Sequence, residues 1–122
     1  MILSFNKRFT PKIKSGTKIH TIRSDPKNRW KPGRLIHFAT GVRTKNYDNF
    51  KKDMCLSTQK IEFKYVMYDD KIPVVLIDRV VLATFEVERL AINDGFDTVQ
   101  GLYDWFDSDF TGKIIHWTHK VY

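Results

Sequence analysis

The sequence predicts a single α+β domain over residues 1–122, built on an antiparallel β-barrel with two main flanking helices. Two observations lead to this class. Short segments that alternate apolar and polar residues recur between residues 17 and 88, separated by turn formers. Two further segments, 5–15 and 97–106, space their apolar residues three or four apart, as a helix does. Many short strands with few helices are typical of a closed or nearly closed barrel.

The first helix and the strand after it are the best-marked elements. Residues 5–13 place three apolar side chains four residues apart, along one face of a helix. Thr10 is a candidate N-cap, and Pro11 suits the first helical position because its missing N–H costs nothing there. Gly16 can take the left-handed conformation that ends a helix. Residues 17–23 then alternate as a strand would.

A turn and a second strand follow. Residues 24–33 are rich in turn formers and close with Pro32-Gly33. Residues 34–40 read as a strand. Trp30 lies in the turn segment and has two interpretations: it covers one end of the barrel, or it is a platform on which a nucleic-acid base stacks.

Residues 41–54 have no clean period and predict an exposed loop, which would be an insertion in the barrel. Tyr47 and Phe50 lie there among several cations. This composition fits contact with a nucleic-acid strand by stacking and phosphate pairing. The alternative is that the two aromatic residues pin the loop to the core.

The second half of the chain continues the strand pattern and then changes period. Strands are predicted at 55–67, 74–77 and 80–88, with a hairpin tip at 69–71. A turn at 93–96 then leads to a new element.

The chain ends with a helix and a closing strand. Asp97 or Thr98 is the expected N-cap of this second helix, whose buried stripe runs to Phe106. Residues 114–122 are the predicted last strand.

The positive charge is concentrated in one half of the chain. The net charge of +7 divides into +12 for residues 1–60 and −5 for residues 61–122. A basic half of this kind attracts polyanions through counterion release, so RNA or a nucleotide is the expected partner. The alternative is that the lysines only keep the surface hydrated.

Several classes of protein are excluded or disfavoured. The single cysteine, Cys55, excludes an internal disulfide, and no apolar run is long enough to cross a membrane. With no signal-peptide pattern at its start, the chain is expected to be cytoplasmic. No glycine-rich phosphate loop occurs, so kinase, NTPase and dinucleotide-binding folds are set aside. The oligomeric state is left open.

The four histidines do not predict a metal site, and no cofactor is expected. His116 and His119 are three apart in a predicted strand and would face opposite sides. His20 and His37 lie on strands expected to be neighbours and could meet. No cysteine or carboxylate cluster completes a zinc-like set.

The most specific motif combines apolar, glycine and polar positions: Phe5, Phe9, Ile13, Gly16, Lys18, Thr21, Ile22 and Arg23. This motif resembles the signature of the ASCH domain family, small β-barrels related to the PUA fold of RNA-modifying proteins. Lys31-Pro32-Gly33 and Asp94-Gly95-Phe96 are similar to weaker family features. The resemblance covers nearly the whole chain apart from residues 41–54, and it implies a PUA-like barrel.

The resemblance implies two functions for the same region. The first is a module that binds RNA or a nucleotide in a basic cleft between the first helix and the barrel. Its expected binding residues are Lys7, Arg8, Lys14, Lys18, Arg23 and Trp30. A third possibility, which needs no family property, is an interaction protein without a nucleic-acid role.

The second implied function is an amidohydrolase that removes an acyl group from a modified nucleoside such as N4-acetylcytidine. On this analogy Lys18 is the base, Thr21 the nucleophile and Asp94 the proton shuttle, in place of the family's usual Glu. Glu86 and Glu88 are reserve carboxylates. In an unbroken strand residues 18 and 21 point to opposite faces, so Lys18 is expected to precede the strand, unless the strand bulges.

Overall fold

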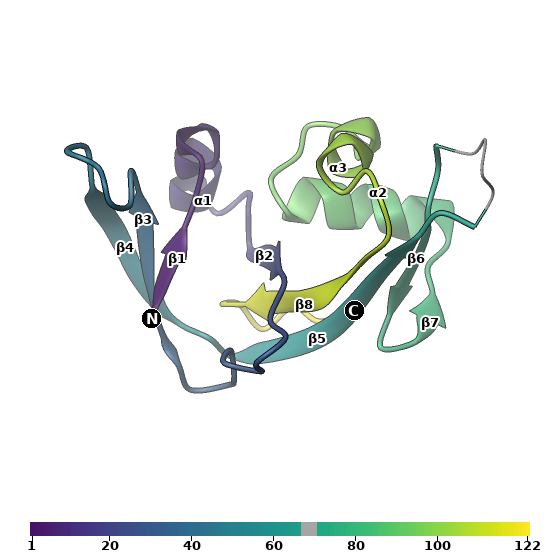
Figure 1. Ribbon diagram of the computed structural model, residues 1–122, viewed down its shortest axis with the longest axis horizontal. Helices are drawn as coiled ribbons and strands as arrows, with labels where there is room; N and C mark the ends of the chain where they lie inside the picture. Colours follow the sequence, from purple (N-terminus) through teal and green to yellow (C-terminus); the bar gives the residue numbers. More distant parts are fainter. Residues whose placement is uncertain (67–70) are drawn as a thin grey trace.

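Figure 1 shows the architecture in a computed structural model that describes residues 1–66 and 71–122. The predicted α+β class is confirmed, because in these residues two sheets are accompanied by helices. The helical elements are η1 (Lys7–Phe9), α1 (Thr10–Ser15), α2 (Thr84–Asn93) and α3 (Val99–Trp105). No helix within the described ranges is both long enough and apolar enough to span a bilayer.

The strands of the described chain form two sheets that do not close into one barrel. The first sheet has the order β1 (Ile2–Ser4), β3 (Leu35–Thr40), β4 (Asp48–Met54). The second has the order β2 (His20–Arg23), β8 (Phe110–His116), β5 (Ser57–Lys64), β6 (Val74–Ile77), β7 (Val80–Val81). Because β1 pairs with β3 in parallel, the prediction of a wholly antiparallel arrangement is wrong.

Two residues connect the sheets almost without a loop. The Cys55 N–H donates to the Arg34 carbonyl beside the first sheet, at 2.8 Å. The next N–H, of Leu56, donates to the His116 carbonyl in the second sheet, also at 2.8 Å. The path from β4 to β5 is therefore one extended strand that changes sheets at a corner.

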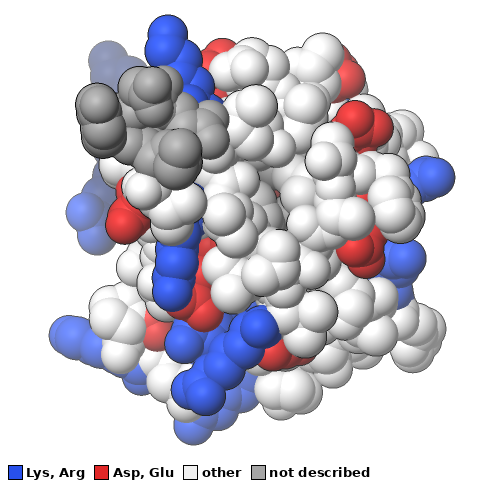
Figure 2. Space-filling view, turned by 90° about the vertical axis from the view of Figure 1, so that its right-hand side faces the viewer, with Lys and Arg blue, Asp and Glu red and all other residues white. Residues whose placement is uncertain are grey.

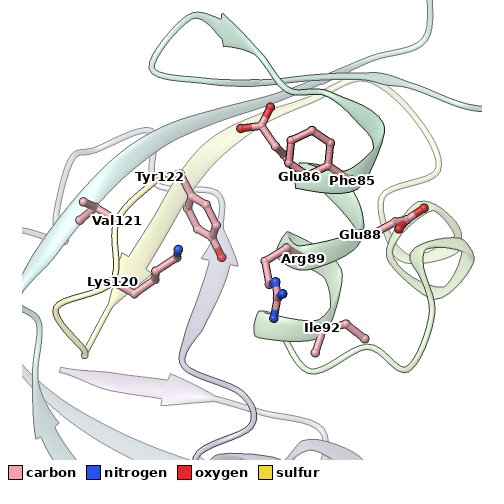
Figure 3. Close-up of a pocket in the computed structure, with 8 residues that line it drawn as sticks. All are labelled: Phe85, Glu86, Glu88, Arg89, Ile92, Lys120, Val121 and Tyr122. Carbon is pink, nitrogen blue, oxygen red and sulfur yellow. The ribbon is translucent and has the colours of Figure 1, made fainter.

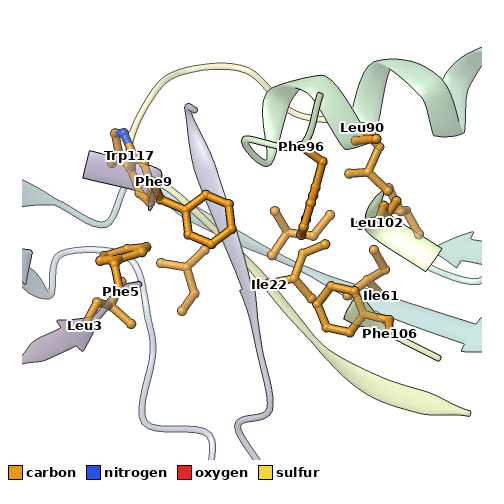
Figure 4. Close-up of a cluster of buried hydrophobic side chains, with 14 of the residues drawn as sticks. Leu3, Phe5, Phe9, Ile22, Ile61, Leu90, Phe96, Leu102, Phe106 and Trp117 are labelled. Atoms are coloured by element: carbon orange, nitrogen blue, oxygen red, sulfur yellow. The ribbon is translucent and has the colours of Figure 1, made fainter. Parts of the chain in front are cut away.

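The hydrophobic core draws on both sheets and on the helices, as Figure 4 shows. Phe38 of β3, Phe63 of β5 and Leu102 of α3 are fully buried. Phe63 stacks on Phe106, with ring centroids 4.7 Å apart. Helices α2 and α3 lie over one face of the second sheet (Figure 1), so they cover its apolar side.

The predicted loop at residues 41–54 is wrong for its second half, which is β4. This strand pairs with β3 along its whole length, with an irregularity between Phe38 and Ala39. As the outer strand of its sheet, β4 has no fully buried residue, so its polar side chains hide the alternation that marks a strand. The turn is confined to residues 41–47, where Gly41 and Arg43 have positive φ.

The predicted strand at 80–88 is also wrong. Only Val80–Val81 pair as a strand, and the helix α2 begins at Thr84. Its buried residues Val87, Leu90 and Ala91 are three and four apart, which is helical spacing. The Glu86 carboxylate accepts the N–H of Ala83 at 2.8 Å and so satisfies one free donor at the helix start.

At the other helices the predicted ends are largely correct. Gly16 ends α1 with φ of 82°, but Phe9 occupies the cap position and Thr10 is the first residue of the helix. This difference arises because η1 runs directly into α1. Thr98 caps α3 by accepting the Gly101 N–H.

The remaining strand predictions differ mainly at their ends. β5 and β6 fall within the predicted strands, while residues 69 and 70 of the expected hairpin tip lie outside the described chain. β8 starts earlier than predicted and ends at His116, so residues 117–122 are not strand.

Candidate functional site

A cavity of about 150 Å³ lies where β1, η1, β2, the α2–α3 turn and the end of α3 meet. Its lining combines aromatic side chains with polar and charged ones. The lining residues are Ser4, Phe5, Asn6, Phe9, Lys18, Thr21, Ile22, Arg23, Asp94, Phe96, Trp105 and Phe106. The structure thus brings together Lys18, Thr21, Arg23 and Asp94, four of the residues predicted to act.

Lys18 reaches the cavity because it precedes β2, so the alternation of a strand does not apply between Lys18 and Thr21. Its backbone N–H donates to the Lys12 carbonyl at 2.9 Å, which holds it beside the end of α1. Its side chain is buried, and the ammonium donates to the Asp94 carbonyl oxygen at 2.6 Å and to Oδ1 at 3.2 Å. The strand therefore needs no bulge to present both residues.

The environment of Lys18 lowers the pKa of its ammonium group. Burial lowers the pKa of the Lys18 ammonium, while the charge of Asp94 and their hydrogen bond partly oppose that shift. The rings of Phe9 and Phe5 lie 5.0 and 5.8 Å from Nζ and supply the apolar surroundings. A lysine in such surroundings can serve as a base more readily than an exposed one.

Asp94 follows the last turn of α2 and is buried. Its Oδ1 is shared by Lys18 Nζ and by Nδ1 of His20, which is 3.0 Å away. Within the described residues Oδ2 has no hydrogen-bond partner. One carboxylate oxygen is thus anchored by two donors, and Asp94 is among the residues that line the cavity.

Thr21 and Arg23 lie two apart on β2 and so share a face of the strand. Arg23 Nε donates to Thr21 Oγ1 at 3.2 Å, and Nη2 donates to the Ser4 carbonyl at 2.5 Å. The guanidinium carbon also lies 4.8 Å from the centre of the Phe5 ring. Since Thr21 accepts from Arg23, its own hydroxyl proton can point towards the cavity.

The other predicted cations lie outside the cavity. Lys7, Arg8 and Lys14 are exposed, and no ion pair in the described part of the chain involves them. Arg8 lies beside the cavity lining, with its guanidinium carbon 5.9 Å from the ring of Trp105. By contrast, the side of the molecule that carries α2, β6 and β7 mixes both charges around an uncharged centre (Figure 2).

Trp30 is not an exposed platform. Its side chain is 6% exposed and belongs to the core, and its carbonyl accepts from Lys113. The exposed indole beside the cavity is Trp105, which is 49% exposed. Sequence reasoning missed Trp105, although its position at the end of an aromatic-rich helix was a signal.

The histidines do not pair as expected. His20 and His37 lie in different sheets, and the neighbour of His20 is His116, with ring centroids 5.3 Å apart. Among the described residues no three His, Cys, Asp or Glu side chains gather into a group that could hold a metal ion. The hydrogen bond between His20 and Asp94 was not anticipated.

The reserve carboxylates Glu86 and Glu88 are not near Lys18. Both lie on α2 and line a separate, open groove of about 600 Å³, shown in Figure 3. In that view Glu88 points away from Lys120 and Tyr122 across the groove. This groove is larger than the cavity but contains none of the predicted catalytic residues, so the smaller cavity is the candidate site.

Comparison of the chain with protein-family models, with curated proteins and with solved structures finds no match. The candidate site must therefore be interpreted through its own geometry and chemistry. That geometry consists of a buried Lys–Asp pair, a threonine hydroxyl and an arginine inside an aromatic enclosure.

Proposed function

We propose that the protein is an ASCH-like module that holds a base of RNA, or of a free nucleotide, in the cavity between η1, β2 and α3. The motif at residues 5–23 supports the family assignment, because Lys18, Thr21 and Arg23 all line one cavity. In this proposal the two sheets, joined at Cys55 and Leu56, correspond to an opened PUA-like barrel.

The observation that carries the proposal is the combination of aromatic and polar side chains in the lining of one cavity. The walls offer flat apolar surface for a heteroaromatic ring, and each stacked base contributes about 1–3 kcal/mol. Lys18 and Arg23 offer donors, and Asp94 Oδ2 offers an acceptor to the edge of such a ring. Both kinds of contact are needed to hold and orient a base.

The size of the cavity limits what enters it. A volume of about 150 Å³ is well below the roughly 300–1,000 Å³ of pockets that hold drug-sized ligands. The base therefore enters, while the sugar and phosphate remain outside. There Arg8, whose guanidinium carbon lies 5.9 Å from the ring of Trp105, would attract phosphate, and the exposed Lys7 and Lys14 would add positive charge.

The first test replaces Trp105, the exposed ring at the cavity. Trp105→Ala should weaken binding of a short single-stranded RNA by about 1–3 kcal/mol, or roughly 5- to 150-fold, because one stacking surface is lost. Fluorescence anisotropy at several salt concentrations measures the affinity, which should fall as salt rises. The matched control is Phe85→Ala, since Phe85 is also exposed but lies in the other groove. Equal affinity of the two variants would contradict the proposal.

A second candidate function is hydrolysis of an amide on the bound base, and the buried Lys18–Asp94 pair favours it. Lys18, as the free amine, would take a proton from the Thr21 hydroxyl or from water. The oxygen then adds to the amide carbon, and the C–N bond breaks. Asp94, hydrogen-bonded to Lys18, would pass that proton to the leaving amine. If Thr21 is the nucleophile, water then cleaves the resulting ester.

The second test is release of cytidine from N4-acetylcytidine. Wild-type protein should turn over, and Lys18→Met, which keeps the chain length without the amine, should lose activity on the order of 10²-fold or more. Circular dichroism and urea unfolding show whether the variant is folded. Folded wild-type protein that releases no cytidine would exclude this reaction but not base binding.

A further inference from the structure

His20 is a buried polar residue that the proposed chemistry does not use. It is fully buried and lies next to Thr21 on β2, so its side chain points to the opposite face of the strand from the threonine. Its Nδ1 is 3.0 Å from Asp94 Oδ1, and its Nε2 is 2.5 Å from the Tyr122 hydroxyl oxygen. Both ring nitrogens are therefore engaged.

The partners determine the direction of each hydrogen bond. The Asp94 carboxylate can only accept, so Nδ1 of His20 must carry a proton. In a neutral ring Nε2 is then an acceptor, and the Tyr122 hydroxyl donates to it. The Tyr122 oxygen in turn accepts from Asn93 Nδ2 at 2.9 Å. In this series of hydrogen bonds each donor therefore faces an acceptor, from Asn93 through Tyr122 and His20 to Asp94.

The series of hydrogen bonds forms a closed ring, because its two end residues, Asn93 and Asp94, are consecutive in the sequence. Tyr122 and His20 of β2 therefore both bind residues at the C-terminal end of α2. Other groups near the His20 ring do not disturb this order: Lys18 is directed to Asp94, and His116 is bonded through Nε2 to Gln59. Asp94 is thereby held from the side away from the cavity.

We propose that His20, oriented by Tyr122, is a positioning residue that fixes Asp94 so that its unpartnered Oδ2 faces the cavity. This inference rests on the proposed function of the cavity, because it assigns Asp94 a contact with the bound base. A single hydrogen bond from Lys18 would leave the carboxylate free to rotate. The second donor, on the same oxygen, removes that freedom.

The first measurement is the protonation of the His20 ring by ¹⁵N NMR. The wild-type protein should show a neutral ring with the proton on Nδ1, the reverse of the usual preference in water. Tyr122→Phe keeps the aromatic ring but removes the donor, so the Nε2 resonance should shift. Tyr47→Phe, at an exposed tyrosine, should leave His20 unchanged. A proton on Nε2 in the wild type would overturn the proposal.

The second measurement follows Asp94 in variants of His20. His20→Leu removes the donor at similar volume, whereas His20→Asn retains an N–H close to the position of Nδ1. The ¹³Cγ resonance of Asp94 should move in the Leu variant and return towards the wild-type value in the Asn variant. RNA binding or N4-acetylcytidine turnover should follow the same order, with a loss on the order of 10²-fold for turnover in His20→Leu.

The two proposals fail in different ways. If the wild type neither binds nor hydrolyses but the NMR pattern holds, the function of the cavity is wrong while the positioning of Asp94 is supported. If the Asp94 resonance is unchanged in both His20→Leu and Tyr122→Phe, the positioning proposal is overturned whatever the activity. Tyr122→Phe is the milder change. If His20→Leu does not fold, the Asp94 resonance in Tyr122→Phe alone tests the positioning proposal.

Discussion

At the scale of single residues, Gly95 shows how closely the cavity is built. It has φ of +95°, a conformation that other residues rarely adopt. A Cβ at this position would lie 2.9 Å from Cδ of Lys18 and 3.0 Å from Cδ1 of Phe9. The Lys18 side chain thus runs directly beside the backbone of Gly95. Because no side chain blocks this path, the ammonium reaches the carbonyl oxygen and Oδ1 of Asp94.

Gly95→Ala should therefore destabilise the protein by roughly 1–3 kcal/mol and displace Lys18. Alanine is strained at this positive φ, and its Cβ would also clash with the Lys18 side chain. Gly101 is the matched control. It lies in α3 and an added Cβ there would meet only ordinary contacts at 3.4 Å or more. Gly101→Ala should be neutral or more stable by about 0.5–1 kcal/mol. Urea unfolding measures both, and equal effects would show that the close contact with Lys18 has no cost.

At the scale of elements, the sequence predicted the parts whose signals are local. Pro11 and Gly16 marked the two ends of α1, and Thr98 marked the start of α3. Lys18 and Thr21 line one cavity, and Lys18 precedes the strand, as their spacing indicated.

The elements that were missed depend on contacts distant in sequence. The residues of α2 alternate as well as they repeat every three or four, so periodicity alone could not separate strand from helix. β4 is specified by its pairing with β3 rather than by its own pattern. In the same way, the link from His20 to Tyr122 joins residues 102 apart, and no local pattern could reveal it.

At the scale of the whole molecule, two buried histidines make stability depend on pH. Burial lowers the pKa of His116 to about 4, with His20 adding to the shift and Asp78 opposing it. Burial also lowers the pKa of His20. Between the ordinary value of 6.5 and these lowered values the unfolded chain binds more protons than the folded one. Stability is therefore fully present above pH 6.5 and declines as the pH falls towards 4.

We expect the free energy of unfolding, measured in urea, to decrease between pH 7 and pH 4.5. His116→Gln should make this decline shallower, because one buried group that protonates on unfolding is gone. His119→Gln, at an exposed position, is the control and should keep the wild-type steepness. A wild-type stability that is flat over this interval, or a His116→Gln profile parallel to it, would contradict the expectation.

The corner at Cys55 and Leu56 has a further consequence when the order of strands is considered. The chain begins in the first sheet with β1, enters the second with β2, returns for β3 and β4, and crosses again at the corner. Neither sheet is thus made from one continuous length of chain. β2 can take its place only after β8, at the far end of the sequence, has been made and paired with it. The cavity, which β2 lines, is consequently complete only when residues from the first quarter of the chain have paired with residues near its end.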